Sequence, residues 1–253
     1  MNTYLKLALL LILFLYNKIY TQPSGGPYGP IKMNYEIPKN KNIIYVSTDG
    51  NESNSGKELN NPTTIEKAIR IAKSGDYIIL RGGVYRTGNL ITNQGIIIQP
   101  YLNEDVTFKG TFLANNWVRI SNNIWKTKWN NLFPEKPADW WRREVDGIKT
   151  PLHKFNNDMV FVNGEMLQSC GWLGEVNEKT FFIDYENKTV YIGQNPENKI
   201  VEITAYNISI LRTKKDVNNL KADKKGIKVK GIKFTQYAYR AIEIEGKDPE
   251  GIS

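Results

Sequence analysis

The chain has 253 residues, of which 40% are hydrophobic, 24% charged and 11% aromatic, so its composition excludes a largely disordered protein. Its single cysteine, Cys170, excludes an internal disulfide, and its single histidine, His153, excludes a metal site built from several histidines. Neither a phosphate-binding glycine loop, a dinucleotide-binding glycine motif nor H-E-x-x-H occurs, so nucleotide-binding and zinc-protease functions have no motif to support them.

The first residues have the layout of a secretory signal peptide. Lys6 precedes an unbroken apolar run, Leu7–Tyr16, and the polar residues Asn17 and Lys18 follow it. Such a run makes a helix of about 15 Å, roughly half the thickness of a bilayer core, so a permanent transmembrane anchor is the weaker alternative. We therefore expect residues 1–21 to be removed and the protein to be secreted, to the periplasm, cell surface or medium, without a stable membrane anchor.

The chain is basic, with 34 Lys and Arg residues against 26 Asp and Glu residues. Removing residues 1–21 deletes two lysines and no acid, which leaves 32 basic residues and a net charge of +6. An exported basic protein can meet acidic polysaccharide, nucleic acid or an anionic membrane surface. The densest lysine run, between Lys214 and Lys225, is interrupted by aspartates and lacks the aromatic partners of a nucleic-acid stacking surface, so we expect no nucleic-acid partner.

A proline- and glycine-rich segment, residues 22–42, is typical of a linker, and a short β-favouring run, Ile43–Val46, follows it. One amphipathic helix is then predicted over residues 63–73. Thr63 and Glu66 fit the S/T-x-x-E capping box at its start. Its apolar stripe recurs at helical spacing and consists of Ile65, Ala68, Ile69 and Ala72.

From Gly75 onward the chain alternates short β-favouring runs with Gly, Asn or Asp, and no second helix has comparable support. Because we find many short strands without two-residue Asn-Gly hairpin turns, we expect a solenoid of short parallel strands, with a β-sandwich as the alternative. The runs are Tyr77–Leu80, Ile96–Ile98, Val106–Phe108, Met159–Val162, Phe181–Ile183, Val190–Ile192, Val201–Ile203, Ile227–Val229, Ile232–Phe234 and Ile242–Ile244.

Three stretches carry a resemblance to a known class of proteins, namely residues 45–56 (YVSTDGNESNSG), 61–68 (NPTTIEKA) and 74–86 (SGDYIILRGGVYR). Together they resemble the opening of secreted right-handed parallel β-helix proteins of the pectin-lyase-like class. In that class an amphipathic helix covers the N-terminal end of the solenoid and protects an edge that would otherwise pair with another chain. The resemblance implies an all-β fold for residues 43–253, a right-handed single-stranded parallel β-helix with an N-terminal capping α-helix.

The resemblance also implies that the solenoid is C-terminally incomplete, because the most regular repeat lies directly before Ser253. In β-helix polysaccharide lyases the catalytic base and the calcium-binding acids usually lie on central coils, which would follow residue 253. Since no position here matches such a motif, we assign no catalytic residue and no metal ligand. No cofactor is identified, and calcium is implied by the resemblance alone.

Residues 115–155 form a tryptophan-rich insertion that holds five of the six tryptophans. The C–H faces of sugar rings pack on indole rings, and Arg or Lys can pair with a carboxylate or sulfate. The candidate substrate-binding residues are therefore Trp140, Trp141, Arg142, Arg143 and His153, of which His153 could also act as a general base. The alternative is that the tryptophans only pack the insertion onto the flank of the β-helix.

Two function classes remain open. By resemblance, the chain is the N-terminal portion of a secreted carbohydrate-active protein that acts on an acidic polysaccharide, as a lyase or as a glycoside hydrolase. The alternative is a non-catalytic secreted or surface β-helix scaffold that binds carbohydrate. Acids for hydrolysis could come from Asp139, Glu144 and Asp146, but a sequence gives no separation between carboxyl groups, on which that mechanism depends. One fold serves many functions, so fold alone does not decide.

Overall fold

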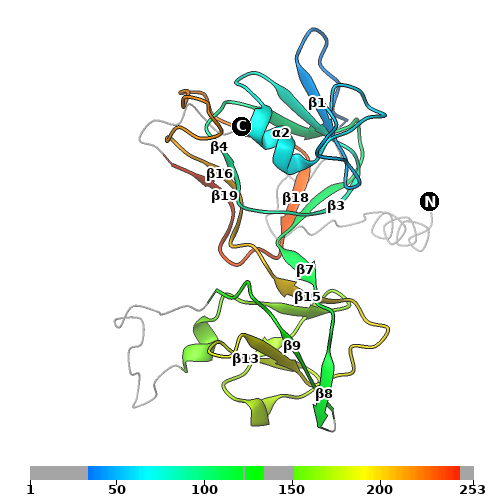
Figure 1. Cartoon of the computed structure of the whole chain (residues 1–253), viewed down its shortest axis with the longest axis vertical. Helices are drawn as coiled ribbons and strands as arrows, with labels where there is room; N and C mark the ends of the chain where they lie inside the picture. Colours follow the sequence, from blue (N-terminus) through cyan, green and yellow to red (C-terminus); the bar gives the residue numbers. More distant parts are fainter. Residues whose placement is uncertain (1–33, 122, 134–150, 246–253) are drawn as a thin grey trace, which may run out of the picture. The chain divides into compact units, whose positions relative to one another are not determined.

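The computed structural model describes residues 34–121, 123–133 and 151–245. Within these ranges the regular secondary structure is almost all β-strand, with one α-helix, two short 3₁₀ helices and five sheets. The predicted all-β class is confirmed at this level (Figure 1). In the described part of the chain, no helix combines the length and the apolar character that crossing a membrane requires.

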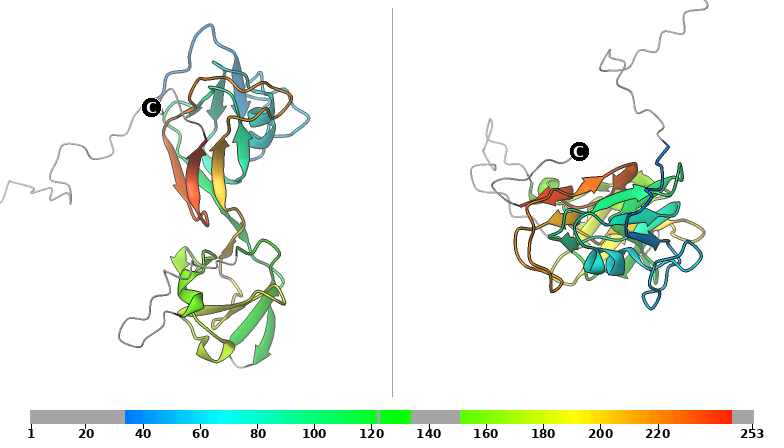
Figure 2. Two further views of the ribbon diagram at one scale, coloured as in Figure 1. Left: turned by 90° about the vertical axis from the view of Figure 1, so that its left-hand side faces the viewer. Right: turned by 90° about the horizontal axis from the view of Figure 1, so that it is seen from above.

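Three of the sheets are parallel, and we call them together the parallel stack. Their strand orders are β1-β2-β5-β17, β18-β6-β3 and β19-β16-β4. The chain visits the three sheets in the same order three times, as β2-β3-β4, then β5-β6-β16, then β17-β18-β19. Strands from the C-terminal part, orange to red in Figure 2, therefore run beside strands from earlier passes. This order explains why the sequence shows short β-favouring runs separated by bends.

The strands of the parallel stack are β1 (Ile43–Val46), β2 (Tyr77–Leu80), β3 (Gly83–Arg86), β4 (Leu90–Thr92), β5 (Ile97–Pro100), β6 (Val106–Lys109), β16 (Ile208–Arg212), β17 (Lys228–Val229), β18 (Ile232–Thr235) and β19 (Arg240–Ile244).

The register of each parallel sheet places like residues beside one another, and these ladders form the core of the stack. One ladder is aromatic: Phe108 pairs with Tyr85 on one side and Phe234 on the other, with ring centroids 5.5 and 5.6 Å apart. Such aromatic pairs add about 0.5–1.5 kcal/mol each beyond the burial of their area. The other two ladders are aliphatic, Ile44-Ile78-Ile98-Val229 and Leu90-Ile210-Ile242.

Helix α2 (Ile65–Ile71) lies inside the predicted range and packs against β1 and β4 (Figure 1). Its expected apolar stripe is confirmed, since Ile65, Ala68, Ile69 and Ala72 are all buried. Burying an isoleucine side chain contributes about 1.5–3 kcal/mol, which is more than the propensity of so short a helix could supply. Packing therefore stabilises this helix.

The predicted capping box was wrong by one residue. Thr64, and not Thr63, is the N-cap, and its Oγ1 accepts a hydrogen bond from the backbone N–H of Lys67 at 3.2 Å. Thr63 is still part of an extended segment, since it forms a parallel bridge with Val46 and is fully buried. Glu66 is free of a capping role and instead accepts a hydrogen bond from Thr87 Oγ1 at 2.6 Å.

Between β6 and β16 the chain leaves the parallel stack and forms what we call the insertion, residues 111–204. It contains two sheets, with strand orders β11-β10-β15-β7 and β12-β13-β14-β9-β8, in which all pairs except β12-β13 are antiparallel. We expected mostly parallel strands over residues 43–253, with an irregular insertion at about 115–155, and that expectation was wrong for the strands of this segment. Its strands are β7 (Thr111–Leu113), β8 (Val118–Ser121), β9 (Ile124–Lys128), β10 (Val160–Val162), β11 (Glu165–Met166), β12 (Gln168–Ser169), β13 (Thr180–Asp184), β14 (Thr189–Ile192) and β15 (Val201–Thr204).

Two turns explain the antiparallel pairing. Asn163 and Gly164, with φ of 51° and 84°, form a two-residue turn between β10 and β11, and Asn-Gly is the dipeptide best suited to such positive φ values. The expectation that the short strands lack Asn-Gly hairpin turns was wrong at this pair. In the turn between β13 and β14, the Asp184 carboxylate accepts hydrogen bonds from the backbone N–H and the side-chain amide of Asn187.

The insertion also has a hydrophobic core of its own, separate from that of the parallel stack. Val160, Val190, Ile192 and Ile203 are completely buried in it. Trp117, Trp125 and Trp129 are partly buried and pack against this core. The insertion is thus held together by its own packing.

Candidate functional site

A buried carboxylate joins the insertion to the parallel stack. Glu202, on β15, is 1% exposed, and its Oε1 accepts a hydrogen bond from Arg86 on β3 at 2.5 Å. Lys109, at the end of β6, donates to Glu202 Oε2 at 2.8 Å. Burial acts to raise the pKa of Glu202, but the hydrogen bonds from Lys109 and Arg86 outweigh it and hold the pKa below its usual value. Glu202 is therefore an ionised structural group and not a proton donor.

Arg86 also lines a pocket of about 600 Å³, which we call the Trp129 pocket. Strand β7 contributes two apolar side chains, and the end of β9 with the three residues after it contributes a lysine, the indole of Trp129 and two amides. The complete lining consists of Arg86, Phe112, Leu113, Lys128, Trp129, Asn130 and Asn131.

Two hydrogen bonds fix Trp129 in this pocket. Its backbone N–H donates to Lys188 O at 2.9 Å, and its indole Nε1 donates to Thr204 O at 2.8 Å. Since the only polar atom of the side chain is satisfied by the protein, the ring contributes apolar surface to the pocket.

The polar lining of the Trp129 pocket is cationic and amidic. Lys128 is exposed and donates from Nζ to Asn187 O at 2.8 Å, which leaves it two further N–H groups. The guanidinium of Arg86 is largely used by Glu202 and by Thr111 O. Asn130 and Asn131 are exposed amides that can both donate and accept. A pocket with two cations, two amides, an indole and no carboxylate favours a ligand that carries hydroxyl groups and negative charge.

The other described tryptophans of the tryptophan-rich segment have packing roles. Trp117 donates from Nε1 to Ala114 O at 2.9 Å, and both Trp117 and Trp125 pack on the core of the insertion. They pack on the core of residues 111–204, whereas the alternative drawn from the sequence was that they pack the insertion onto the flank of the β-helix.

Four of the five candidate residues, Trp140, Trp141, Arg142 and Arg143, lie outside the described residues. So do the three acids considered for hydrolysis, at positions 139, 144 and 146. His153 is described, in the 3₁₀ helix η2 (Leu152–Phe155), and it is not among the residues that line the Trp129 pocket.

The imidazole of His153 lies against Gly171. A Cβ atom at position 171 would come within 2.9 Å of His153 Nδ1, so only glycine allows this approach. Next to it, Glu175 of the 3₁₀ helix η3 (Leu173–Glu175) accepts a hydrogen bond from the Gly171 N–H at 2.8 Å. The structure thus places His153 in a packing contact.

Two notable side chains were missed by the sequence analysis. Asp158 is 2% exposed, and its Oδ2 accepts hydrogen bonds from Phe133 N and Tyr185 Oη, both at 2.9 Å. Burial raises the pKa of Asp158 to about 6, against the lowering effect of these two bonds.

Trp172 is the sixth tryptophan and is 62% exposed. No local pattern marks either residue, because burial of an aspartate and exposure of a tryptophan depend on tertiary contacts.

The described residues contain no group of three His, Cys, Asp or Glu side chains placed to hold a metal ion. In the Asx-rich segment after β1, Asn51 Oδ1 accepts hydrogen bonds from the backbone N–H and the hydroxyl of Ser53. The hydrogen bonds of a local turn therefore already use this oxygen.

No protein-family model matches the chain, and no curated protein matches it. Among solved structures, one described as the complex structure of XylC with xylose has a TM-score of 0.56 and 19% sequence identity, covering 78% of this chain and 36% of that chain. Another, described as a glycoside hydrolase, has a TM-score of 0.48 and 14% identity, covering 78% of this chain and 51% of that chain. The chain thus spans about a third of the length of the first and half of the second. The described residues have an all-β fold that resembles part of the XylC structure.

Proposed function

We propose that this chain belongs to a secreted carbohydrate-active protein of the right-handed parallel β-helix class, and that it binds an acidic polysaccharide in the Trp129 pocket. The threefold passage through three parallel sheets supports the β-helix architecture. The likeness in fold to a protein solved with xylose is in keeping with a carbohydrate ligand, at the level of fold alone. Secretion rests on the N-terminal sequence pattern.

One observation carries the proposal, which is the lining of the Trp129 pocket. An indole ring suits the C–H face of a sugar, exposed amides suit its hydroxyl groups, and Lys128 suits its carboxylate or sulfate. Because no residue of this lining is acidic, an anionic sugar meets no like charge there.

Between the two function classes, the Trp129 pocket favours binding. Glycoside hydrolysis needs two carboxyl groups on either side of the scissile bond, and this lining has none. Glu202, the carboxylate that neighbours it through Arg86, is ionised and shared by two cations. A lyase or hydrolase reaction would therefore use residues outside this pocket.

Binding is tested by titrating the full chain with an oligogalacturonate in a calorimeter, at low and at physiological salt. Because a charge-assisted hydrogen bond contributes about 1.5–3 kcal/mol, we expect Lys128→Gln to weaken binding about tenfold or more. Added salt should weaken the binding of the unchanged protein as well. Lys57→Gln, which removes an exposed lysine of the loop after β1, is the matched control and should leave the affinity unchanged. Equal affinities of Lys128→Gln and the unchanged chain would refute the proposed site.

A further inference from the structure

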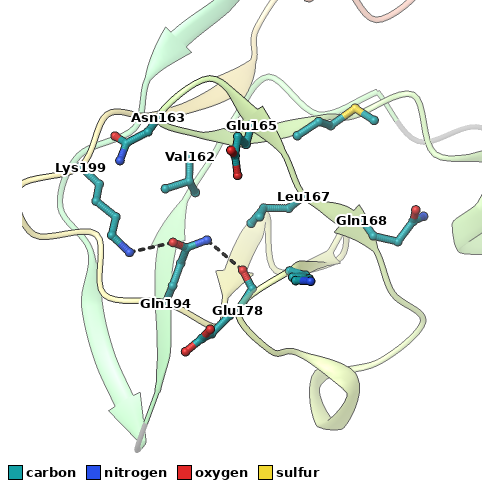
Figure 3. A pocket seen from close by; sticks show the side chains of 10 residues that line it. Val162, Asn163, Glu165, Leu167, Gln168, Glu178, Gln194 and Lys199 are labelled. Carbon is teal, nitrogen blue, oxygen red and sulfur yellow. Dashed lines mark hydrogen bonds between the residues drawn. The ribbon is translucent and has the colours of Figure 1, made fainter.

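A second pocket, of about 520 Å³, lies elsewhere on the insertion (Figure 3). It is lined by residues from the end of β10 to β12, by the two residues before β13, and by the loop that follows β14. We call it the Gln194 pocket, after the amide that Figure 3 shows between Lys199 and Glu178. It shares no lining residue with the Trp129 pocket.

The Gln194 amide is held in place from both ends. Lys199 Nζ donates to Gln194 Oε1 at 2.7 Å, and Gln194 Nε2 donates to Glu178 O at 2.9 Å. One N–H of this amide and two N–H groups of Lys199 remain available. The pocket therefore offers donors whose positions are fixed before a ligand arrives, which lowers the entropy that binding costs.

Two carboxylates add acceptors to the polar lining. Glu165, on β11, and Glu178, in the loop before β13, both line the pocket, together with Lys179 and Lys199. Within the described chain, neither carboxylate forms an ion pair with these lysines, so their oxygens are available as acceptors. The charges of these four groups sum to zero, whereas the charged groups of the Trp129 pocket are both cations.

Apolar side chains form another part of the pocket. Val162 and Leu167 are 5% and 6% exposed and belong to the core of the insertion, so their positions are fixed by packing. Met166 is 63% exposed and lines the same pocket. A thioether side chain of this kind adapts readily to an apolar ligand surface.

We propose that the Gln194 pocket is a second saccharide site, which selects uncharged, hydroxyl-rich sugar units. Adjacent sugar hydroxyls can donate as a pair to one carboxylate, while the Gln194 amide and the Lys199 ammonium donate to other hydroxyls. Apolar surface from Met166 serves the C–H face of the ring. A uronate would bring a third negative charge beside Glu165 and Glu178. Repulsion between the uronate and these two carboxylates offsets its attraction to the lysines.

The test is titration of the full chain with a neutral xylo-oligosaccharide and, separately, with an oligogalacturonate of equal length. We expect Glu165→Ala and Glu178→Ala each to weaken binding of the neutral sugar about fivefold or more, since each removes a charged acceptor. Glu165→Gln keeps an acceptor and removes the charge, so neutral binding should fall less and discrimination against the oligogalacturonate should relax. Glu186→Ala, an exposed acid in the turn between β13 and β14, is the control and should change neither affinity.

The result also distinguishes this proposal from the proposed function. Lys128→Gln should weaken the oligogalacturonate and leave the neutral sugar unaffected, whereas Glu165→Ala should weaken the neutral sugar and leave binding at the Trp129 pocket unaffected. If titration with the neutral sugar at concentrations up to about 10 mM detects no binding, the second site is refuted. It is refuted equally if neutral binding survives both alanine substitutions or is lost in Lys128→Gln.

Discussion

Replacing Asp158 with asparagine should make the free energy of unfolding less dependent on pH. In the folded protein Asp158 Oδ2 accepts from Phe133 N and Tyr185 Oη, while Oδ1 is buried without a hydrogen-bond partner among the described residues. An asparagine can place its oxygen at the Oδ2 position and keep both bonds. Its amide nitrogen then replaces the oxygen that has no partner, so Asp158→Asn removes the charge and changes the shape of the site little.

The sign and size follow from the pKa of Asp158. Burial raises this pKa from 3.8 to about 6, so the folded state binds the proton more tightly than the unfolded state. The stability that this group contributes is fully present below about pH 3.8 and is lost as pH rises through about 6. A shift of about two pKa units corresponds to about 3 kcal/mol, since one unit is about 1.4 kcal/mol. At neutral pH the ionised Asp158 therefore destabilises the fold relative to its protonated form.

Urea unfolding of the unchanged chain and of Asp158→Asn, from pH 4 to pH 7.5, measures this effect. The buried amide nitrogen adds an offset in stability that does not depend on pH, whereas the difference between the two proteins should move by about 2–3 kcal/mol in favour of the variant as pH rises through this range. Asp184→Asn is the control: hydrogen bonds from Asn187 hold the pKa of Asp184 below its usual value of 3.8, so this group stays ionised across the range and its variant should differ from the unchanged chain by a nearly constant amount. If the difference between Asp158→Asn and the unchanged chain stays constant across this range, the raised pKa is wrong.

Two further predictions concern the contact between the insertion and the parallel stack, and export. Glu202→Gln leaves Arg86 and Lys109 without their buried anion, so the free energy of unfolding should fall by about 3 kcal/mol in urea titration. Glu104→Gln, which removes the charge of a carboxylate more exposed than Glu202 and paired with Arg81, should cost about 1 kcal/mol or less. Equal costs of the two substitutions would contradict the buried role of Glu202. A fusion of residues 1–30 to a reporter enzyme should be secreted and shortened near residue 21, and retention of the unshortened reporter in the cytoplasm would contradict the predicted signal peptide.

Local sequence patterns determined much of the parallel stack. The run Tyr77–Leu80 is strand β2 as predicted, and the apolar stripe of helix α2 is buried as its spacing indicated. These features depend on neighbouring residues, since side chains alternate along a strand and recur every three or four residues along a helix. The same patterns could not separate Thr63 from Thr64 as the N-cap, because both are threonines and only the bridge between Thr63 and Val46 decides.

Strand direction in the insertion was within reach of the sequence and was missed, because Asn163-Gly164 is a local hairpin signal. The sites themselves were not within reach. Glu202 meets Arg86 from 116 residues away and Lys109 from 93 residues away, and the Trp129 pocket joins side chains of β3, β7 and β9. Which charges are buried together, and which rings face a pocket, depends on contacts between distant segments, and only the tertiary structure brings those segments together.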